Sequence, residues 1–222
     1  MNLNLFQSQM NIKILFKILQ VLYDVHPEAI ENVSVTSDLH TFPQEVQAFI
    51  DAQLRYASLA REHNILTTPD ENGQLPLHVA LRDNVTLGSI KLLVKGNPSA
   101  VSVQDNRGMM PLHIACKYHE SASVVQYLLD LDPTGLQSRD LDGNSVLHHA
   151  CCGGKHETIT LLLEKYNFTV STPNSNKQLP IDLLLQSEAV SDKESIAHNN
   201  SIFRLCNQQH VQNCCFGGFP HI

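Results

Sequence analysis

The chain has 222 residues, 42% hydrophobic and 17% charged, which is enough to build a sizeable folded core. Its formal net charge of −7 and its 15 scattered lysines and arginines argue against a nucleic-acid-binding protein, which usually carries a basic face. Six cysteines without the regular spacing of a disulfide framework favour reduced thiols. We therefore expect a cytoplasmic protein, with the nucleus as the alternative location.

The N-terminal segment predicts an amphipathic helix. Residues 12–30 read "IKILFKILQVLYDVHPEAI", and their polar residues recur at helical spacing. Neither a signal peptide nor a membrane span would carry such a polar stripe, which consists of Lys13, Lys17, Gln20 and Asp24. We expect residues 1–43 to form this helix, as a partial repeat, and an irregular loop.

A longer helix is predicted next, over residues 44–63. Most of one helical face there is apolar, as shown by Val46, Phe49, Ile50, Leu54, Ala57 and Leu59. We expect region 44–69 to consist of this long helix and a lead-in segment. The helix would pack between the N-terminal helix and the segment that follows.

From residue 70 onward one phrase recurs. "PLH" begins at Pro76 and Pro111 and "VLH" at Val146, at intervals of 35 residues. A glycine stands three residues before each phrase, an aspartate three before that glycine, and an alanine two after each histidine. A weakened fourth copy, "NSNKQLPIDLL", follows. Such a period indicates a stack of one supersecondary unit.

Each unit has the same predicted plan. Asp-x-x-Gly is typical of a tight turn, because Asp bonds nearby backbone and Gly accepts positive φ. Proline then opens a short helix, where its missing N–H costs nothing. This helix runs to about Arg82, Lys117 and Cys152, and a second apolar helix follows, with "SIKLLVK", "SVVQYLL" or "TITLLLE". An extended segment leads to the next Asp.

This plan resembles the ankyrin repeat, whose signature is D-x-x-G-x-T-P-L-H-x-A. The matching phrases are "DENGQLPLHVA", "DNRGMMPLHIA" and "DLDGNSVLHHA". The resemblance implies an all-α fold, an ankyrin-type α-solenoid of stacked helix-turn-helix repeats with short hairpin-like fingers. A tetratricopeptide array has a similar period, but its aromatic and small-residue signature is absent. We expect the array over 70–188 in about four units, the last degenerate, a capping helix over 189–207 and a disordered tail over 208–222.

The sequence departs from the family at the residue before the helix. The family's capping Thr is replaced by Leu75, Met110, Ser145 and Leu179. Only Ser145 has a hydroxyl that can cap. A missing cap costs about 1 kcal/mol per helix, so these repeats are expected to be softer than the family consensus.

Two His-Cys pairs stand at metal-like spacing, His113 with Cys116 and His148 with Cys151. The resemblance implies instead that these histidines, with His78, bond backbone, and that the cysteines fill small-residue helix positions. Zinc takes four ligands at about 2.0–2.3 Å, and the family's stacking sets equivalent residues too far apart to share one ion. We expect no metal and no cofactor.

Catalytic motifs are also missing from the sequence. Phosphate-loop, H-E-x-x-H and G-x-S-x-G patterns are absent. Cys152 is a candidate exposed thiol with His149 or His156 as a base on paper, but it lacks an orienting group. We predict no catalytic residue.

The resemblance implies a non-catalytic protein-protein interaction module that binds a partner through the concave groove and finger tips. We expect a monomer that binds neither nucleic acid nor a membrane. An alternative is a regulatory or adaptor fragment of a larger signalling or degradation protein, and a third is a Cys/His metal-dependent enzyme. The family's contact positions correspond here to Glu71, Asn72, Gln74, Arg82, Asp83, Asn106, Arg107, Met109, Lys117, Tyr118, Leu141, Asp142, Asn144, Cys152, Ser175, Asn176 and Gln178. Tyr118, Arg107 and Met109 are the expected anchors.

Overall fold

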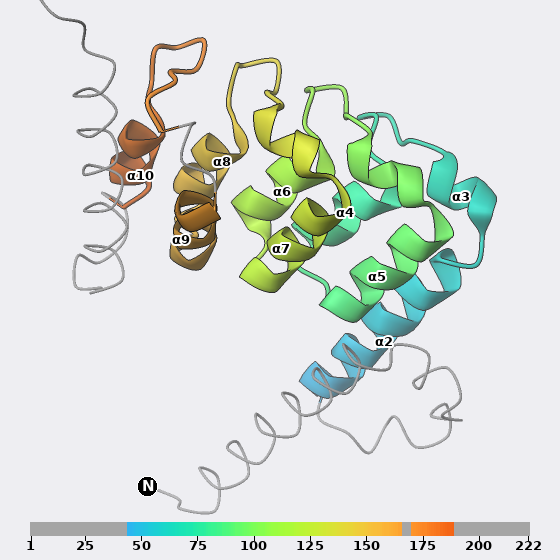
Figure 1. Ribbon diagram of the computed structural model, residues 1–222. Coiled ribbons are helices and arrows are strands. Elements are labelled where there is room, and N and C mark those ends of the chain that lie inside the picture. Colours follow the sequence, from blue (N-terminus) through green and yellow to red (C-terminus); the bar gives the residue numbers. More distant parts are fainter. Residues whose placement is uncertain (1–43, 166–169, 189–222) are drawn as a thin grey trace, which may run out of the picture.

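The computed structural model describes residues 44–165 and 170–188, and these form a stack of helical pairs (Figure 1). The inner row comprises α4 (Pro76–Arg82), α6 (Pro111–Tyr118), α8 (Val146–Cys152) and α10 (Pro180–Glu188). The outer row comprises α5 (Leu87–Gly96), α7 (Ala122–Leu131) and α9 (His156–Lys165). Successive helices of each row pack on one another. The predicted helix over 12–30, the capping helix and the tail lie outside the described residues.

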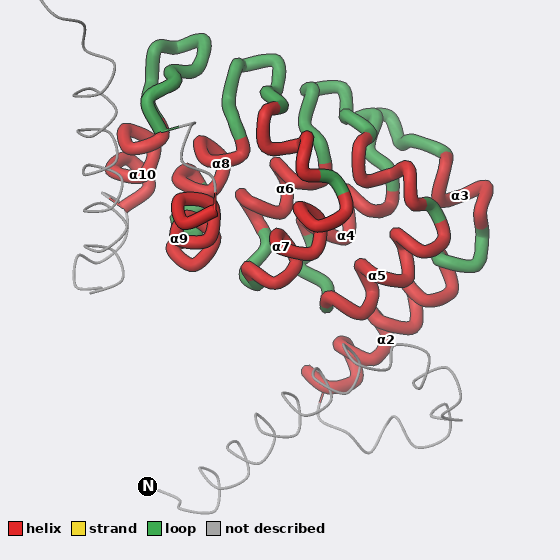
Figure 2. Tube along the Cα trace, viewed as in Figure 1, coloured by secondary structure: helices red, strands yellow, loops and turns green. Residues whose placement is uncertain are grey.

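The predicted all-α solenoid is confirmed. Helices and loops alone make up the described chain (Figure 2), apart from one isolated bridge between Arg139 and Ser145. The short first helices begin and end where the repeat predicted. Proline at the first position of α4, α6 and α10 starts each helix without losing an internal hydrogen bond.

The first described helix, α2 (Gln44–Leu59), takes the place of an outer helix, since it packs on α5 as α5 packs on α7. The prediction of one helix to residue 63 is corrected here. Beyond Leu59 the backbone tightens, with Arg61 and Glu62 donating three residues back. A short helix, α3 (His63–Thr67), then leads to the first finger.

The predicted extended arms are also corrected in part. The segments after α5 and α7 first form 3₁₀ helices, η3 (Pro98–Ser102) and η4 (Pro133–Gln137). Proline opens each one with the required φ. Asp132 caps η4, since its side chain accepts a hydrogen bond from the Thr134 N–H at 3.1 Å.

The fingers are the loops over 70–75, 105–110, 140–145 and 174–179, at the top of Figure 1. In the first finger the Asp70 carboxylate accepts hydrogen bonds from the N–H groups of Asn72 (2.9 Å) and Gln74 (2.8 Å), and Gly73 has φ +74°. This is the tight turn that Asp-x-x-Gly predicted. The fourth finger uses Asn174 for the same bonds, and Lys177 adopts φ +60° in the glycine place.

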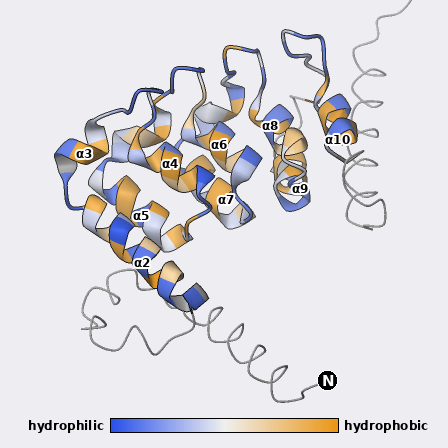
Figure 3. Cartoon of the chain, turned by 180° about the vertical axis from the view of Figure 1, so that it is seen from behind, coloured by the Kyte–Doolittle hydropathy of each residue, from blue (hydrophilic) through white to orange (hydrophobic). Residues whose placement is uncertain are grey.

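Neighbouring fingers are joined by one backbone hydrogen bond each. Asn106 N–H donates to the Asn72 carbonyl, Leu141 to Arg107, and Ser175 to Asp142, each at 2.9 Å. The fingers are largely hydrophilic (Figure 3). These bonds keep the fingers in register along the stack.

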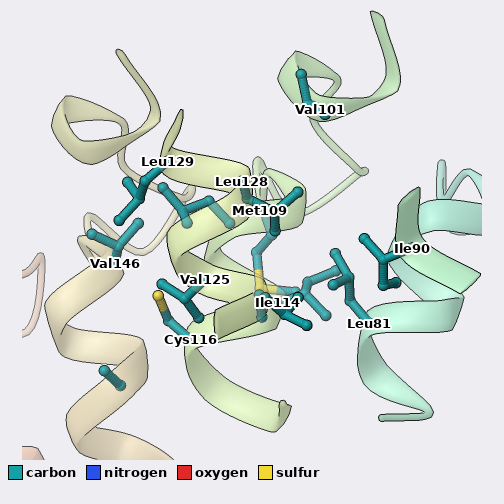
Figure 4. Packing of buried hydrophobic residues seen from close by; sticks show 14 of the residues in the cluster. Leu81, Ile90, Val101, Met109, Ile114, Cys116, Val125, Leu128, Leu129 and Val146 are labelled. Carbon is teal, nitrogen blue, oxygen red and sulfur yellow. The ribbon is translucent and has the colours of Figure 1, made fainter. Parts of the chain in front are cut away.

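Apolar side chains from both rows merge into one core (Figure 4). Leu81, Ile90, Ile114, Val125 and Val146 are each no more than 1% exposed. Burying one such side chain contributes about 1.5–3 kcal/mol. Because no single helical pair encloses this core, each unit depends on its neighbours.

Candidate functional site

Three buried histidines connect the start of their own helix to backbone further along the chain. The Nδ1 atom of His78 accepts the Leu75 N–H at 3.1 Å, and its Nε2 lies 3.1 Å from the Val103 carbonyl. In the same way, His113 accepts the Met110 N–H, and its Nε2 lies 3.3 Å from the Ser138 carbonyl. His148 accepts the Ser145 N–H, and its Nε2 lies 3.1 Å from the Gln178 carbonyl. Because Nδ1 accepts, the proton lies on Nε2, which donates.

These contacts give the histidines of the His-Cys pairs a structural role. Burial lowers the pKa of His78, His113 and His148, in the case of His113 to about 4, so the rings are neutral near pH 7. Burial raises the pKa of the Cys116 thiol. Among residues 44–165 and 170–188 no three His, Cys, Asp or Glu side chains are grouped closely enough to hold a metal ion.

Ser145 is the residue before α8, and its hydroxyl lies 2.8 Å from His148 Nδ1. In the fourth unit the carboxylate of Asp182 replaces the imidazole and accepts the Leu179 N–H at 2.8 Å. The N-terminal turn of the helix therefore uses the third helical residue as its acceptor in all four units.

A cavity of about 200 Å³ lies between the fingers and inner helices of the second, third and fourth units. We call this side of the molecule, made by the fingers and the inner row, the inner face. The predicted contact residues that line the cavity are Arg107, Met109, Lys117, Asp142, Asn144, Cys152, Asn176 and Gln178. The other predicted residues, which lie outside its lining, are Glu71, Asn72, Gln74, Arg82, Asp83, Asn106, Tyr118, Leu141 and Ser175.

Several predicted residues are already engaged within the protein. Gln74, only 8% exposed, accepts a hydrogen bond from Arg82 at 2.9 Å and donates one to Asp105 at 3.2 Å. Asp83 accepts the Tyr56 hydroxyl at 3.0 Å. Met109 is 7% exposed, so the predicted anchor presents little of its side chain. These side chains contribute first to contacts between units.

The cavity also contains residues that the sequence reasoning did not place at a binding site, namely Asp140, His148, His149, Asn174 and Leu183. His149 is the most informative of them. It occupies the position held by Val79 and Ile114 in the preceding units. A polar residue at an apolar repeat position is the signal that could have marked it.

His149 and Asp140 form a buried pair, with 2.8 Å between Nε2 and Oδ2 and side chains 7% and 5% exposed. Burial lowers the pKa of His149, against the opposing effect of Asp140. Burial raises the pKa of Asp140, but hydrogen bonds from Asn144 and His149 outweigh it and hold the pKa below its ordinary value. Asp140 is therefore ionised and His149 neutral near pH 7.

Two stacked rows of short helices with projecting fingers define a helical-repeat solenoid. A family model described as ankyrin repeats (3 copies) matches residues 53–137 and 77–177, together more than half of the chain. The chain belongs to the ankyrin-repeat family. Ankyrin repeats are generally protein-protein interaction modules and are typically non-catalytic. No curated protein is matched by the chain.

Across residues 44–165 and 170–188, no helix is both long and apolar enough to cross a bilayer.

Proposed function

We propose that the chain binds a partner protein through the inner face, using the concave groove and the finger tips, and catalyses no reaction. The observation that carries this proposal is the cavity on that face. Eight residues from three successive units line it, and each had been singled out as a contact position. Concave sites lined by a few convergent polar groups are the usual places for binding.

Exposed side chains beside the cavity support the same face. Leu141, at the tip of the third finger, is 76% exposed, and Tyr118, at the end of α6, is 37% exposed. Tyr, Arg and Met are enriched in the cores of interfaces. Tyr118 and Arg107 are therefore the proposed anchors, with Leu141 at the rim.

Panning a phage-displayed random peptide library against the purified chain tests this proposal. Enriched peptides should bind at least about tenfold more weakly to the double variant Tyr118→Ala/Arg107→Ala, because few interface residues carry most of the binding energy. Leu131→Ala, at an exposed position on outer helix α7, is the matched control and should bind normally. Equal binding by the double variant, with an unchanged melting temperature, would remove the inner face from the proposal.

The proposal includes a monomeric chain in the cytoplasm, with the nucleus as the alternative. The free thiols of Cys116, Cys151 and Cys152 support a reducing compartment. Light scattering of the purified chain measures its oligomeric state, and a dimer at micromolar concentration would contradict the proposed monomer.

A further inference from the structure

A chain of hydrogen bonds bridges the first and second units. Arg82 donates to the side-chain oxygen of Gln74 at 2.9 Å, and the Gln74 amide donates to the Asp105 carboxylate at 3.2 Å. One glutamine thus satisfies a cation on its own unit and an anion on the next. The side chain of Gln74 is buried in doing so.

The same three positions are occupied differently one unit later. Met109 stands in the place of Gln74, Lys117 in that of Arg82, and Asp140 in that of Asp105. The thioether of methionine is at best a weak acceptor and has no hydrogen to donate. The bridge between the two units is therefore missing, and the cavity of about 200 Å³ lies there.

Asp140 is hydrogen-bonded to other residues than Lys117. Asp140 accepts hydrogen bonds from the Asn144 N–H (2.7 Å), the Asn144 amide (3.0 Å) and His149 Nε2 (2.8 Å). These donors are neutral groups, so Asp140 keeps its negative charge, but its oxygens are hydrogen-bonded without Lys117.

The two cations at the cavity, Lys117 and Arg107, form no ion pair within the described residues. The Lys117 ammonium lies 5.1 Å from the centre of the Tyr118 ring, a cation–π contact. Across the described ranges no ion pair or side-chain hydrogen bond is found for Lys117 or for the Arg107 guanidinium, which also lines the cavity. The lining carries two carboxylates, Asp140 and Asp142, beside these two cations. Asp140 already accepts three hydrogen bonds from other groups, so the donors of Lys117 and Arg107 are left for a further acceptor.

We propose that this cavity holds an acidic side chain, aspartate or glutamate, of the protein partner. A carboxylate oxygen then takes the place that the Gln74 oxygen occupies one unit earlier and accepts hydrogen bonds from Lys117 and Arg107. The inference rests on the proposed function, since it names the chemistry of the partner. Charge-assisted hydrogen bonds of this kind are roughly twice as strong as neutral ones, so glutamate is selected over glutamine.

Two peptides that differ at one position test the inference without the natural partner. The probes are acetylated, amidated pentapeptides with glutamate or glutamine between flanking alanines, titrated into the ¹⁵N-labelled full chain and followed by NMR. The glutamate peptide should shift the signals of the cavity residues and bind about tenfold more tightly than the glutamine peptide. Raising the salt concentration should reduce this preference, because screening weakens partly exposed ion pairs.

Matched variants locate the effect. Lys117→Met should bring the affinity for the glutamate peptide down to that for the glutamine peptide. Arg82→Met is the control at the same place one unit earlier, where the cation already has an internal partner, and it should keep the preference. Asp142→Asn should strengthen the preference, because it removes the competing carboxylate.

Equal affinity for the two peptides, no binding of either, or an unchanged preference in Lys117→Met with native melting behaviour would each overturn the inference. None of these results touches the proposed function, which depends on the panning experiment and on Tyr118. Conversely, peptides selected by panning that lack an acidic residue would contradict the chemistry assigned to the cavity and leave the inner face as the binding surface.

Discussion

Mild acid should destabilise this protein, because several histidines are buried as neutral rings. His113 has no exposed surface, and its Nδ1 atom accepts the Met110 N–H at 3.1 Å. A second proton on the ring would break that bond and place a charge in the core. Burial accordingly lowers the pKa of His113 from 6.5 to about 4.

The size of the effect follows from linkage. The unfolded chain binds the proton more readily than the folded chain, so the free energy of unfolding falls as pH drops below 6.5 and keeps falling to about 4. One pKa unit corresponds to 1.36 kcal/mol, so His113 alone removes about 2 kcal/mol between pH 6.5 and 5. The lowered pKa values of His78 and His148 act in the same direction.

Urea denaturation at pH 7 and pH 5 measures this loss. In His113→Gln the amide oxygen can still accept the Met110 N–H, as the carboxylate of Asp182 accepts the Leu179 N–H in the fourth unit. The variant should lose about 2 kcal/mol less than the wild type on acidification, whatever its stability at pH 7. A flat response between pH 7 and 8 in both proteins is the internal control. The same pH dependence in both proteins between pH 7 and 5 would refute the reasoning.

The remaining predictions concern a strained turn, a buried amide and the thiols. Lys177→Gly should raise the free energy of unfolding by about 1 kcal/mol in urea titrations, since φ +60° is unfavourable for lysine; no gain would show that the turn is unstrained. Gln53→Ala should lower the free energy of unfolding by about 1–3 kcal/mol, because the Gln53 side-chain oxygen accepts hydrogen bonds from the buried hydroxyls of Thr86 and Ser89 at the start of α5. A loss under about 0.5 kcal/mol, which is typical of a surface substitution, would contradict this. Brief alkylation of the native chain should modify Cys152 but spare Cys116 and Cys151, as peptide mass spectrometry can show; modified Cys116 would mean that the core opens.

The repeated phrase was sufficient to predict the unit, because each residue in it has one physical task. The aspartate and glycine of the fingers, the helix-opening prolines and the bridging histidines all act as the pattern indicated. Such tasks are local or repeat at a fixed interval, and a sequence shows both kinds directly. The third helical residue is a good example, since His148 and Asp182 differ in chemistry and accept the same N–H group.

Short or compensated features escaped prediction. The 3₁₀ helices span five residues each, too few for a periodic signal. The positive φ of Lys177 is imposed by the hydrogen bonds that Asn174 makes across the turn, although lysine does not favour it. In both cases a neighbouring interaction overrides the preference of the residue itself.

The cavity shows a further limit. The proposed contact positions around it could be transferred from the repeat, but the cavity lies where Met109 stands in place of the bridging Gln74. Its polar wall depends on the pairing of Asp140 with His149, nine residues apart in sequence and on opposite sides of a finger turn. Neither relation follows from spacing along one helix or strand.

The histidine contacts give the stack a polarity. Each imidazole reaches forward along the chain. His113 lies against the Ser138 carbonyl, in the segment that leads to the third finger, and His148 lies against the Gln178 carbonyl of the fourth finger. Removing units from the front would leave every remaining ring with its acceptor. Cutting the chain before Gln178 would leave His148 with a buried donor and nothing to receive it. As far as these hydrogen bonds are concerned, shortening the stack at its front leaves them intact and shortening it at its back does not.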